Sequence, residues 1–300
     1  MTKMSRRRVT RLTLALAAAG ALLLTGCTVN AGNEPAPADT EGEGGGEPAV
    51  ETLTPGVLKI GSQQSYIPGE FFPEGEDQVT GFSVDFVDEI ASRLGLETEW
   101  VQVDYSAIIT GLQSSQFDMG SGGMSPNPER LEQVDMVGYF QSGATFILRK
   151  EDEGKYADAQ SLCGQTIGML EGSSTLEAAV AKENETCDTP INVQYYTSTP
   201  LGLQGLLSGR IEAYTPDVAQ TQFIVKENPN DFVPIGDYTL VDYLINYTFT
   251  KENTELRDAV YEQLQAMMED GTYDEILDEW GITAGGLDKP AFNGDLDATP

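Results

Sequence analysis

Apolar residues recur along the chain in two alternating patterns, short β-type runs and longer stretches with helical spacing. The stretch 81–95 places its apolar residues between Phe86 and Leu94 on one helical face, and Gly95 provides a C-terminal stop. The first half of the chain is expected to contain strands at 56–62, 98–103 and 117–119 and helices at 81–95 and 105–115. This β-α-β-α-β order is typical of a parallel sheet.

The same alternation restarts after residue 163. We expect strands at 164–170, 191–196 and 210–216, with helices at 172–183, 199–209 and 217–227. A further strand at 243–252 precedes two helices within 253–281, of which Asn253 caps the first and Gly271 separates the second. The second half therefore repeats the architecture of the first.

Two successive units of this kind predict an α/β protein with two α/β lobes and a cleft between them. Ligands in such sheets bind beyond the carboxyl ends of the strands. Three segments lie at those ends, "GGMSPNPER" (122–130), "EGSST" (171–175) and "TPD" (215–217). We expect all three to face the cleft.

The N-terminus has the pattern of an export signal. A basic stretch at 5–11 precedes 13 uncharged residues at 12–24, fewer than the ~20 that a membrane span needs. The run ends in "LTGC" (24–27), which resembles a bacterial lipobox. We expect residues 1–26 to be a lipoprotein signal peptide and Cys27 to become the lipidated first residue. A plain secretory signal with a chance cysteine is the alternative.

Two further segments have compositions that cannot build a core. Residues 27–54 are rich in Gly, Pro, Glu and Ala and contain no aromatic residue, so we expect a disordered tether. Residues 285–300 have a similar composition and are expected to form a flexible tail. About 230 residues remain between them, enough for one large or two small domains.

The charge balance excludes one class of partner. The chain has 48 acidic and 17 basic residues and a formal net charge of −31, which becomes −36 when residues 1–26, with five bases and no acids, are removed. Such a surface repels phosphate backbones, so nucleic acid is excluded as a partner.

The cysteines and the absence of histidine bear on metal binding. The chain has no histidine, and Cys163 and Cys187 alone cannot complete a usual structural zinc site, so we expect no metal and no cofactor. In an exported chain these two cysteines are expected to form a disulfide, with two free buried thiols as the alternative.

The segment "GGMSPNPER" contains two prolines and an asparagine, which suit neither a helix interior nor a strand interior. Gly122 and Gly123 allow close backbone approach, and the amide groups of such a loop favour an anion. Ser125 adds a hydroxyl, and Arg130 adds a planar guanidinium that matches a carboxylate bidentately. The alternative is a surface arginine paired with a neighbouring glutamate.

The second lobe offers the opposite charge. Asp217 follows a strand end, where it can accept hydrogen bonds from an ammonium group, although it could equally be a helix N-cap. Ser173 and Ser174 lie where a helix begins, and ordinary N-capping explains them equally well. An anion site in one lobe and a cation site in the other would together hold an α-amino acid.

Over about residues 56–282 the chain resembles the family-3 extracellular solute-binding proteins, the polar amino-acid receptors of bacterial ABC importers. The resemblance rests on several motifs in the family's order: "TGFSVDFVDEIASRLG", "DYSAIITGLQSSQFDM", "GMSPNPER", "QTIGMLEGSS", "LLSGRIEAYTPD" and "EDGTYDEILDEWG". It implies a periplasmic-binding-protein-like fold of type II, in which the chain crosses between the lobes twice.

The resemblance also implies where these crossings fall, near 148–150 and 246–248. Lobe 1 would then be discontinuous, comprising 55–148 and 247–284, and lobe 2 would comprise 149–246.

Individual roles follow from the same resemblance. Arg130 matches the arginine that binds the ligand carboxylate, helped by Ser125, the backbone at Gly123 and, from lobe 2, Ser174. Asp217 matches the aspartate that takes the α-ammonium. Tyr66 and Tyr105 match apolar walls around the ligand side chain. The full expected ligand-binding set is Gln63, Tyr66, Tyr105, Gly123, Ser125, Asn127, Arg130, Ser173, Ser174 and Asp217.

Three positions depart from the family pattern. Gln63 stands where many members have an acidic residue that binds the cationic side chain of the ligand. Asn127 replaces a threonine that is common in the family. Gly69 stands where an aromatic residue is usual, so Phe71 or Phe72 is expected to fill that wall. The neutral residue at 63 favours a neutral polar amino acid such as glutamine, with a cationic one left open.

We therefore expect a monomeric receptor, lipid-anchored on the extracytoplasmic face of the bacterial membrane, with no enzymatic activity. It would close on a polar amino acid by hinge motion and deliver it to an ABC-importer permease. One alternative is a receptor for a non-proteinogenic zwitterion such as ectoine. The other is a cyclohexadienyl-dehydratase-like lyase, for which the sequence shows no pair of acid and base residues placed for catalysis.

Overall fold

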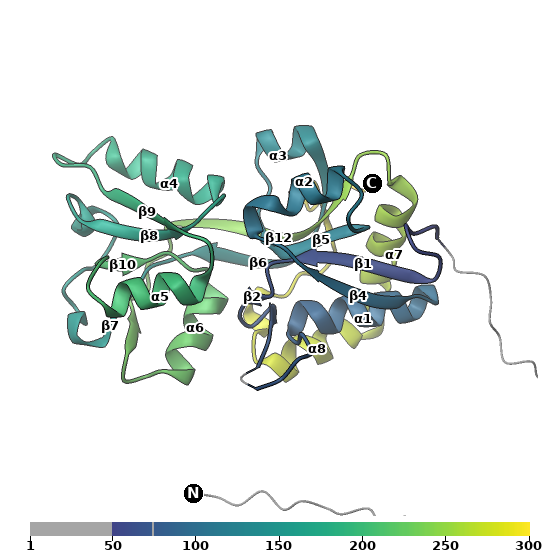
Figure 1. Cartoon of the computed structure of the whole chain (residues 1–300), viewed down its shortest axis with the longest axis horizontal. Helices are drawn as coiled ribbons and strands as arrows, with labels where there is room; N and C mark the ends of the chain where they lie inside the picture. The colour runs from purple at the N-terminus through teal and green to yellow at the C-terminus, as the bar shows by residue number, and fades with distance from the viewer. Residues whose placement is uncertain (1–49, 74) are drawn as a thin grey trace, which may run out of the picture. The chain divides into compact units, whose positions relative to one another are not determined.

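The computed structural model describes residues 50–73 and 75–300 (Figure 1). The predicted signal peptide 1–26, Cys27 and the tether up to residue 49 lie outside the described residues. Among the helices of the described part, none combines the length and the apolar character that crossing a bilayer requires. The predicted α/β class with two lobes, each containing its own sheet, is confirmed.

Lobe 1 is built on a six-stranded sheet with the order β13-β6-β12-β5-β1-β4. Parallel pairs join β1 to β4 and β5, and antiparallel pairs join β12 to β5 and β6 and β13 to β6. The strands are β1 Val57–Ser62, β4 Glu97–Gln102, β5 Met119–Met124, β6 Val134–Ala144, β12 Val241–Thr250 and β13 Ala291–Phe292. A short hairpin of β2 (Ser65–Tyr66) and β3 (Glu70–Phe71) follows β1.

Helices cover both faces of this sheet (Figure 1). They are α1 Phe82–Leu94, α2 Ile108–Gln113, α3 Pro128–Gln133, α7 Thr254–Asp270 and α8 Thr272–Trp280. The apolar stripes of α1, α7 and α8 join one face of the sheet in a single core cluster, and α2 contributes to a separate cluster. The stripe predicted for α1 is buried, and Gly95 ends this helix in the left-handed conformation with φ 71°, which glycine adopts without strain.

Lobe 2 has a five-stranded sheet with the order β11-β7-β10-β8-β9. The strands are β7 Ile147–Arg149, β8 Thr166–Leu170, β9 Asn192–Tyr196, β10 Ala213–Tyr214 and β11 Phe232–Pro234, and the helices are α4 Ser174–Asn184, α5 Thr199–Leu207 and α6 Val218–Glu227. The disulfide predicted between Cys163 and Cys187 is present in this lobe.

The chain passes between the lobes along β6 and β12. Ile147 already belongs to the second sheet, and Val241 already belongs to the first. At the same time Ala144, at the end of β6, and Val241, at the start of β12, pack in or against the core of lobe 2. The paired ends of these two strands therefore carry the chain from one lobe to the other.

The C-terminal segment differs from the flexible tail expected at 285–300. Its residues 291–292 form β13, which pairs with β6 at the edge of the first sheet. The side chain of Asn293 accepts a hydrogen bond from the backbone N–H of Met136 at 2.8 Å, and Ala291 is fully buried. The composition of this segment did not predict that the backbone groups of residues 291–292 pair with β6 and complete the edge of the sheet.

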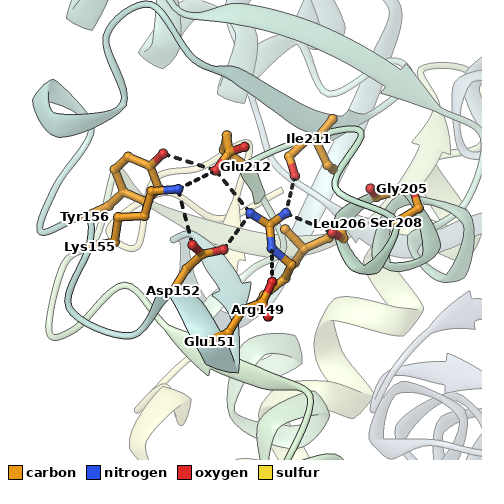
Figure 2. Close-up of polar contacts among 10 residues, drawn as sticks. All are labelled: Arg149, Glu151, Asp152, Lys155, Tyr156, Gly205, Leu206, Ser208, Ile211 and Glu212. Atoms are coloured by element: carbon orange, nitrogen blue, oxygen red, sulfur yellow. Dashed lines mark hydrogen bonds and ion pairs between the residues drawn. The ribbon is translucent and has the colours of Figure 1, made fainter.

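A buried arginine fixes one end of the lobe 2 sheet (Figure 2). Arg149, at the end of β7, forms ion pairs with Asp152 and Glu212. Its guanidinium also donates to the backbone carbonyls of Leu206 and Ile211 at 3.0 and 2.8 Å. These bonds join β7, the turn after it, the end of α5 and the segment before β10.

We expect the substitution Arg149→Met to lower the free energy of unfolding by about 2–3 kcal/mol. It leaves the carboxylates of Asp152 and Glu212 with Lys155 as their remaining cation, and it removes the donor of two backbone carbonyl oxygens. Urea unfolding monitored by circular dichroism measures this change. Lys289→Met is the matched control, since its partner Asp297 is 94 % exposed. Equal stabilities of the two variants would show that the Arg149 network contributes nothing beyond a surface pair.

Candidate functional site

A cleft lies between residues of the two lobes. Its walls are the segments at the carboxyl ends of β1 and β5 in lobe 1 and of β8 and β10 in lobe 2, as the topology predicts. The lining residues are Gln63, Tyr66, Tyr105, Gly122, Gly123, Ser125, Leu170, Ser173, Leu176, Thr199, Tyr214, Thr215, Pro216, Asp217, Gln220 and Tyr243.

The lobe 1 wall is made by the segment "GGMSPNPER", which is more ordered than its sequence suggested. Strand β5 runs to Met124 and not only to Met119, and Pro128 is the first residue of α3, where its missing N–H costs nothing. Gly123 has φ 74°, and a Cβ there would lie 2.9 Å from the ring of Tyr66. Only glycine lets this aromatic ring pack against the strand end.

Arg130 and Asn127 lie at the junction of the lobes. The Asn127 side chain caps α3 by accepting from the Arg130 N–H at 2.9 Å, and its amide group donates to the Ser174 hydroxyl of lobe 2 at 2.8 Å. The Arg130 guanidinium donates to the carbonyl of Ser125 at 2.6 Å and to the carbonyl of Gly172 in lobe 2 at 2.8 Å. Arg130, Asn127 and Ser174 are not among the lining residues.

Arg130 is not the surface arginine that was the alternative interpretation. It is 6 % exposed, and the hydrogen bonds of its guanidinium go to carbonyl and hydroxyl oxygens rather than to either neighbouring glutamate. Its guanidinium carbon lies 5.7 Å from the centre of the Tyr105 ring, which lines the cleft. A buried positive charge therefore stands directly beside the cleft.

Asp217 supplies the opposite charge from lobe 2, and it is at once an N-cap and a cleft residue. Its Oδ1 accepts from the Gln220 N–H at 2.7 Å at the start of α6, and the residue is 6 % exposed. Burial raises the pKa of Asp217 to about 6, partly opposed by that backbone N–H. Asp217 is the one charged residue among those that line the cleft.

The structure thus brings seven of the ten predicted residues to the cleft wall: Gln63, Tyr66, Tyr105, Gly123, Ser125, Ser173 and Asp217. Sequence reasoning missed other lining residues, chiefly Thr199, Gln220 and Tyr243. Gln220 lies one helical turn after Asp217, and this spacing could have revealed it. Tyr243 comes from the returning strand β12, and no local sequence signal connects it with the cleft.

The expectation that Phe71 or Phe72 fills the wall at Gly69 is wrong. Phe72 is 41 % exposed, and neither residue lines the cleft. The Phe71 ring instead lies 6.0 Å from Phe223 of lobe 2 and 6.3 Å from Trp280. Gly69 itself packs under the Tyr66 ring, where a Cβ would approach to 2.3 Å. The Tyr66 ring therefore occupies the space that an aromatic side chain at position 69 would need.

The cleft wall combines hydroxyls, amides and aromatic rings with a single carboxylate. The Tyr66 hydroxyl, which is buried in this wall, has no hydrogen-bond partner among the described residues. Within 50–73 and 75–300, no group of three metal-ligating side chains is present. Such a surface suits a small polar zwitterion better than a metal or a large apolar ligand.

A second buried carboxyl lies behind the cleft. Glu70 pairs with Tyr66 in the β2–β3 hairpin and is 0 % exposed. Its Oε1 accepts from the Ser121 hydroxyl of β5, whereas its Oε2 has no partner among the described residues. Burial raises the pKa of Glu70 to about 8, because a single hydroxyl cannot replace the hydration of a carboxylate.

We expect this carboxyl to make the protein less stable as pH rises. Its pKa is higher in the folded than in the unfolded state, so its contribution is complete below about pH 4.5 and is lost as pH rises toward 8. Between these values the free energy of unfolding should fall by about 1.4 kcal/mol per pH unit from this group alone. Urea unfolding at several pH values measures the slope in the wild type and in Glu70→Gln. Identical slopes would contradict a protonated Glu70.

Comparisons with known proteins agree with this fold. Residues 58–283 match the bacterial extracellular solute-binding proteins, family 3. The arginine-binding protein ArgT of Corynebacterium glutamicum is 25 % identical over 256 residues, covering 82 % of this chain and 83 % of that protein.

Solved structures extend the agreement. An ancestral arginine-binding protein bound to arginine has a TM-score of 0.69 and 30 % identity, covering 75 % of this chain and 98 % of its own. The ancestral amino acid-binding protein AncCDT-1, a precursor of cyclohexadienyl dehydratase, has a TM-score of 0.67 and 26 % identity, covering 75 % of this chain and 95 % of its own.

The fold, with its two α/β lobes and a cleft between them, is that of the type II periplasmic binding proteins. The chain belongs to the family-3 bacterial extracellular solute-binding proteins, and the family identified from its motifs is thereby confirmed.

Proposed function

We propose that this protein is the substrate-binding component of an ABC importer and captures a polar α-amino acid. The observation that carries the proposal is the pairing of opposite charges at one cleft, the Asp217 carboxylate in its wall and the Arg130 guanidinium beside it. They come from different lobes. A zwitterion held between them would bridge the lobes and stabilise the closed form.

In this proposal each end of the zwitterion has its own set of groups. The α-ammonium donates to Asp217. The α-carboxylate accepts from the Ser125 hydroxyl, from backbone N–H groups near Gly123 and from Arg130, which would exchange a carbonyl partner for the ligand. The Tyr66 and Tyr105 rings contact the ligand side chain. The relatives named for amino acids support this assignment.

Two parts of the proposal rest on the sequence. Anchoring to the membrane through Cys27 follows from the lipobox-like "LTGC", and delivery to a permease follows from membership of the family. The lyase alternative has one supporting observation, the similarity to AncCDT-1, but the name of that protein also describes an amino acid-binding protein.

A thermal-shift screen of the purified protein tests the function. The panel is the twenty amino acids with ornithine, citrulline, ectoine, prephenate and arogenate. A ligand present at 100 times its dissociation constant should add about 2.7 kcal/mol of stability. Stabilisation by amino acids alone supports the proposal. Stabilisation by ectoine alone, or conversion of prephenate or arogenate to product, would contradict it.

The substitution Asp217→Asn should weaken binding of the amino acid by about 2 kcal/mol, or roughly thirtyfold, because it removes the charge that pairs with the ammonium. Asparagine keeps the side-chain oxygen that caps α6, so the fold should persist. Isothermal titration calorimetry measures the change, and unchanged affinity would refute the assignment of Asp217.

Binding should also depend on pH. The ammonium requires an ionised Asp217, whose pKa is about 6 in the free protein. Affinity should therefore be constant above pH 7 and fall about tenfold per pH unit well below 6. Titrations between pH 4.5 and 8 measure this profile. The Asp217→Asn variant should lose the dependence, and a profile that it leaves intact would assign the titration to another group.

A further inference from the structure

The C-terminal segment lies outside the part of the chain that matches the family, which ends at residue 283. After β13 it forms a tight turn. Asn293 and Gly294 have φ of 52° and 84°, values that asparagine and glycine tolerate best. Around them, Phe292 and Asp295 exchange backbone hydrogen bonds of 2.9 and 3.0 Å, as in the two-residue turns that an Asn-Gly pair favours. We refer to residues 292–295 as the C-terminal turn.

Hydrogen bonds and a cation–π contact hold the C-terminal turn on lobe 1. The backbone N–H of Asn293 donates to the Met136 carbonyl at 2.8 Å, and its side chain accepts from the Met136 N–H at 2.8 Å. The same side chain donates to Asp135 at 3.2 Å. The Arg257 guanidinium, which pairs with Asp135, lies 5.2 Å from the centre of the Phe292 ring. The turn is therefore fixed to the first residues of β6 and to α7.

The C-terminal turn also packs against the loop that carries the proposed carboxylate site. A Cβ at position 294 would lie 2.9 Å from Cγ of Pro126, so the Gly294 backbone stands directly against the proline ring. The residue before this proline is Ser125, whose hydroxyl belongs to the cleft wall. The residue after it is Asn127, which caps α3 and donates to Ser174 of lobe 2. A displacement of Pro126 would therefore move a cleft residue and a contact between the lobes together.

We propose that the C-terminal turn is a positioning element for ligand binding. By packing on Pro126, it holds the Ser125 hydroxyl and the Asn127 cap where the carboxylate end of the ligand needs them. Residues 292–295 are not among those that line the cleft, so they act through this loop. The inference rests on the proposed function and deepens it, because it gives the segment outside the family match a part in binding.

The influence of the turn should be confined to one end of the ligand. The turn contacts the beginning of β6, whereas Asp217 forms a bridge with Ala144 at the far end of that strand. The ammonium end should therefore not depend on the turn.

Gly294→Ala tests the inference, because the added methyl group would meet Pro126. Gly154→Ala is the matched control, since Gly154 has φ 75° and open space around it, so alanine brings backbone strain without a new contact. Each protein is titrated calorimetrically with L-arginine, L-glutamine and any other amino acid of the thermal-shift panel that stabilises the wild type. We expect Gly294→Ala to bind about fivefold more weakly than the wild type and Gly154→Ala to bind within about twofold of it.

Double variants separate positioning from a general loss of structure. The loss caused by Gly294→Ala should shrink in the background of Ser125→Ala, because both changes act on the carboxylate end. It should persist in full in the background of Asp217→Asn, which acts on the ammonium end. If Gly294→Ala does not fold, Asn293→Gly decides by the same measurements. It keeps a residue that tolerates positive φ and removes the side-chain bonds to Met136 and Asp135.

The contrary outcomes are distinguishable. Equal affinities of Gly294→Ala and Gly154→Ala would overturn the inference and leave the amino-acid receptor intact. A loss that Ser125→Ala does not diminish would also overturn it, because the turn would then act elsewhere than on the carboxylate end. Absence of binding of every panel amino acid by the wild type would refute the proposed function and the inference together.

Discussion

The antiparallel pairing of β6 with β12 is the constraint on which the placement of the cleft residues depends. The ladder runs from Val241 opposite Ala144 to Thr250 opposite Val134, and the rings of Tyr139 and Tyr247 stack across it at 4.0 Å. These are the strands by which the chain leaves lobe 1 and returns to it. In Figure 1 they lie side by side where the two lobes meet.

Both walls of the cleft are tied to this ladder. At the end of β6, Ala144 forms a bridge with Asp217, and the N–H of Thr145 donates to the carbonyl of Pro216 at 3.1 Å. From β12, the Asn246 amide donates to the carbonyl of Met124 at 3.0 Å, at the end of β5. The group proposed to bind the ammonium and the strand end proposed to approach the carboxylate are therefore positioned by the same two strands. A change in the twist of the ladder would move the two walls relative to each other.

Local rules predicted most of the elements of this fold. The helical stripe of α1, the alternation that repeats after Cys163 and the glycine stops all appear where spacing and capping place them. These local rules failed where pairing with a segment distant in the sequence determines the structure. Residues 291–292 become a strand because β6 offers an open edge, although their composition resembles a flexible tail.

The same distinction applies to the site. Asp217 and Ser125 follow strand ends, so topology alone could locate them beside the cleft. Tyr243 could not be found in this way, because it reaches the cleft from β12, 26 residues after Asp217 and across the ladder. The exact position of Arg130 could not be predicted from the sequence either. Its position beside the wall, rather than in it, depends on the carbonyls of Ser125 and Gly172, and no side-chain pattern encodes these partners.

The electrostatics of the cleft agree with a receptor that binds and releases. Burial raises the pKa of Asp217 to about 6, so its ionised form is favoured at neutral pH but is poorly solvated. A cationic ligand group would restore the lost interactions, and water would replace it when the lobes open. Binding energy is thereby linked to closure, which a hinged receptor requires.

A crystal structure of the protein with the amino acid that stabilises it most would test the central claim directly. The account predicts one ligand in the cleft, with its α-nitrogen within about 3 Å of an Asp217 carboxylate oxygen and its carboxylate facing Ser125 and Arg130. A ligand bound outside the cleft, or one whose ammonium faces a different acid, would contradict it.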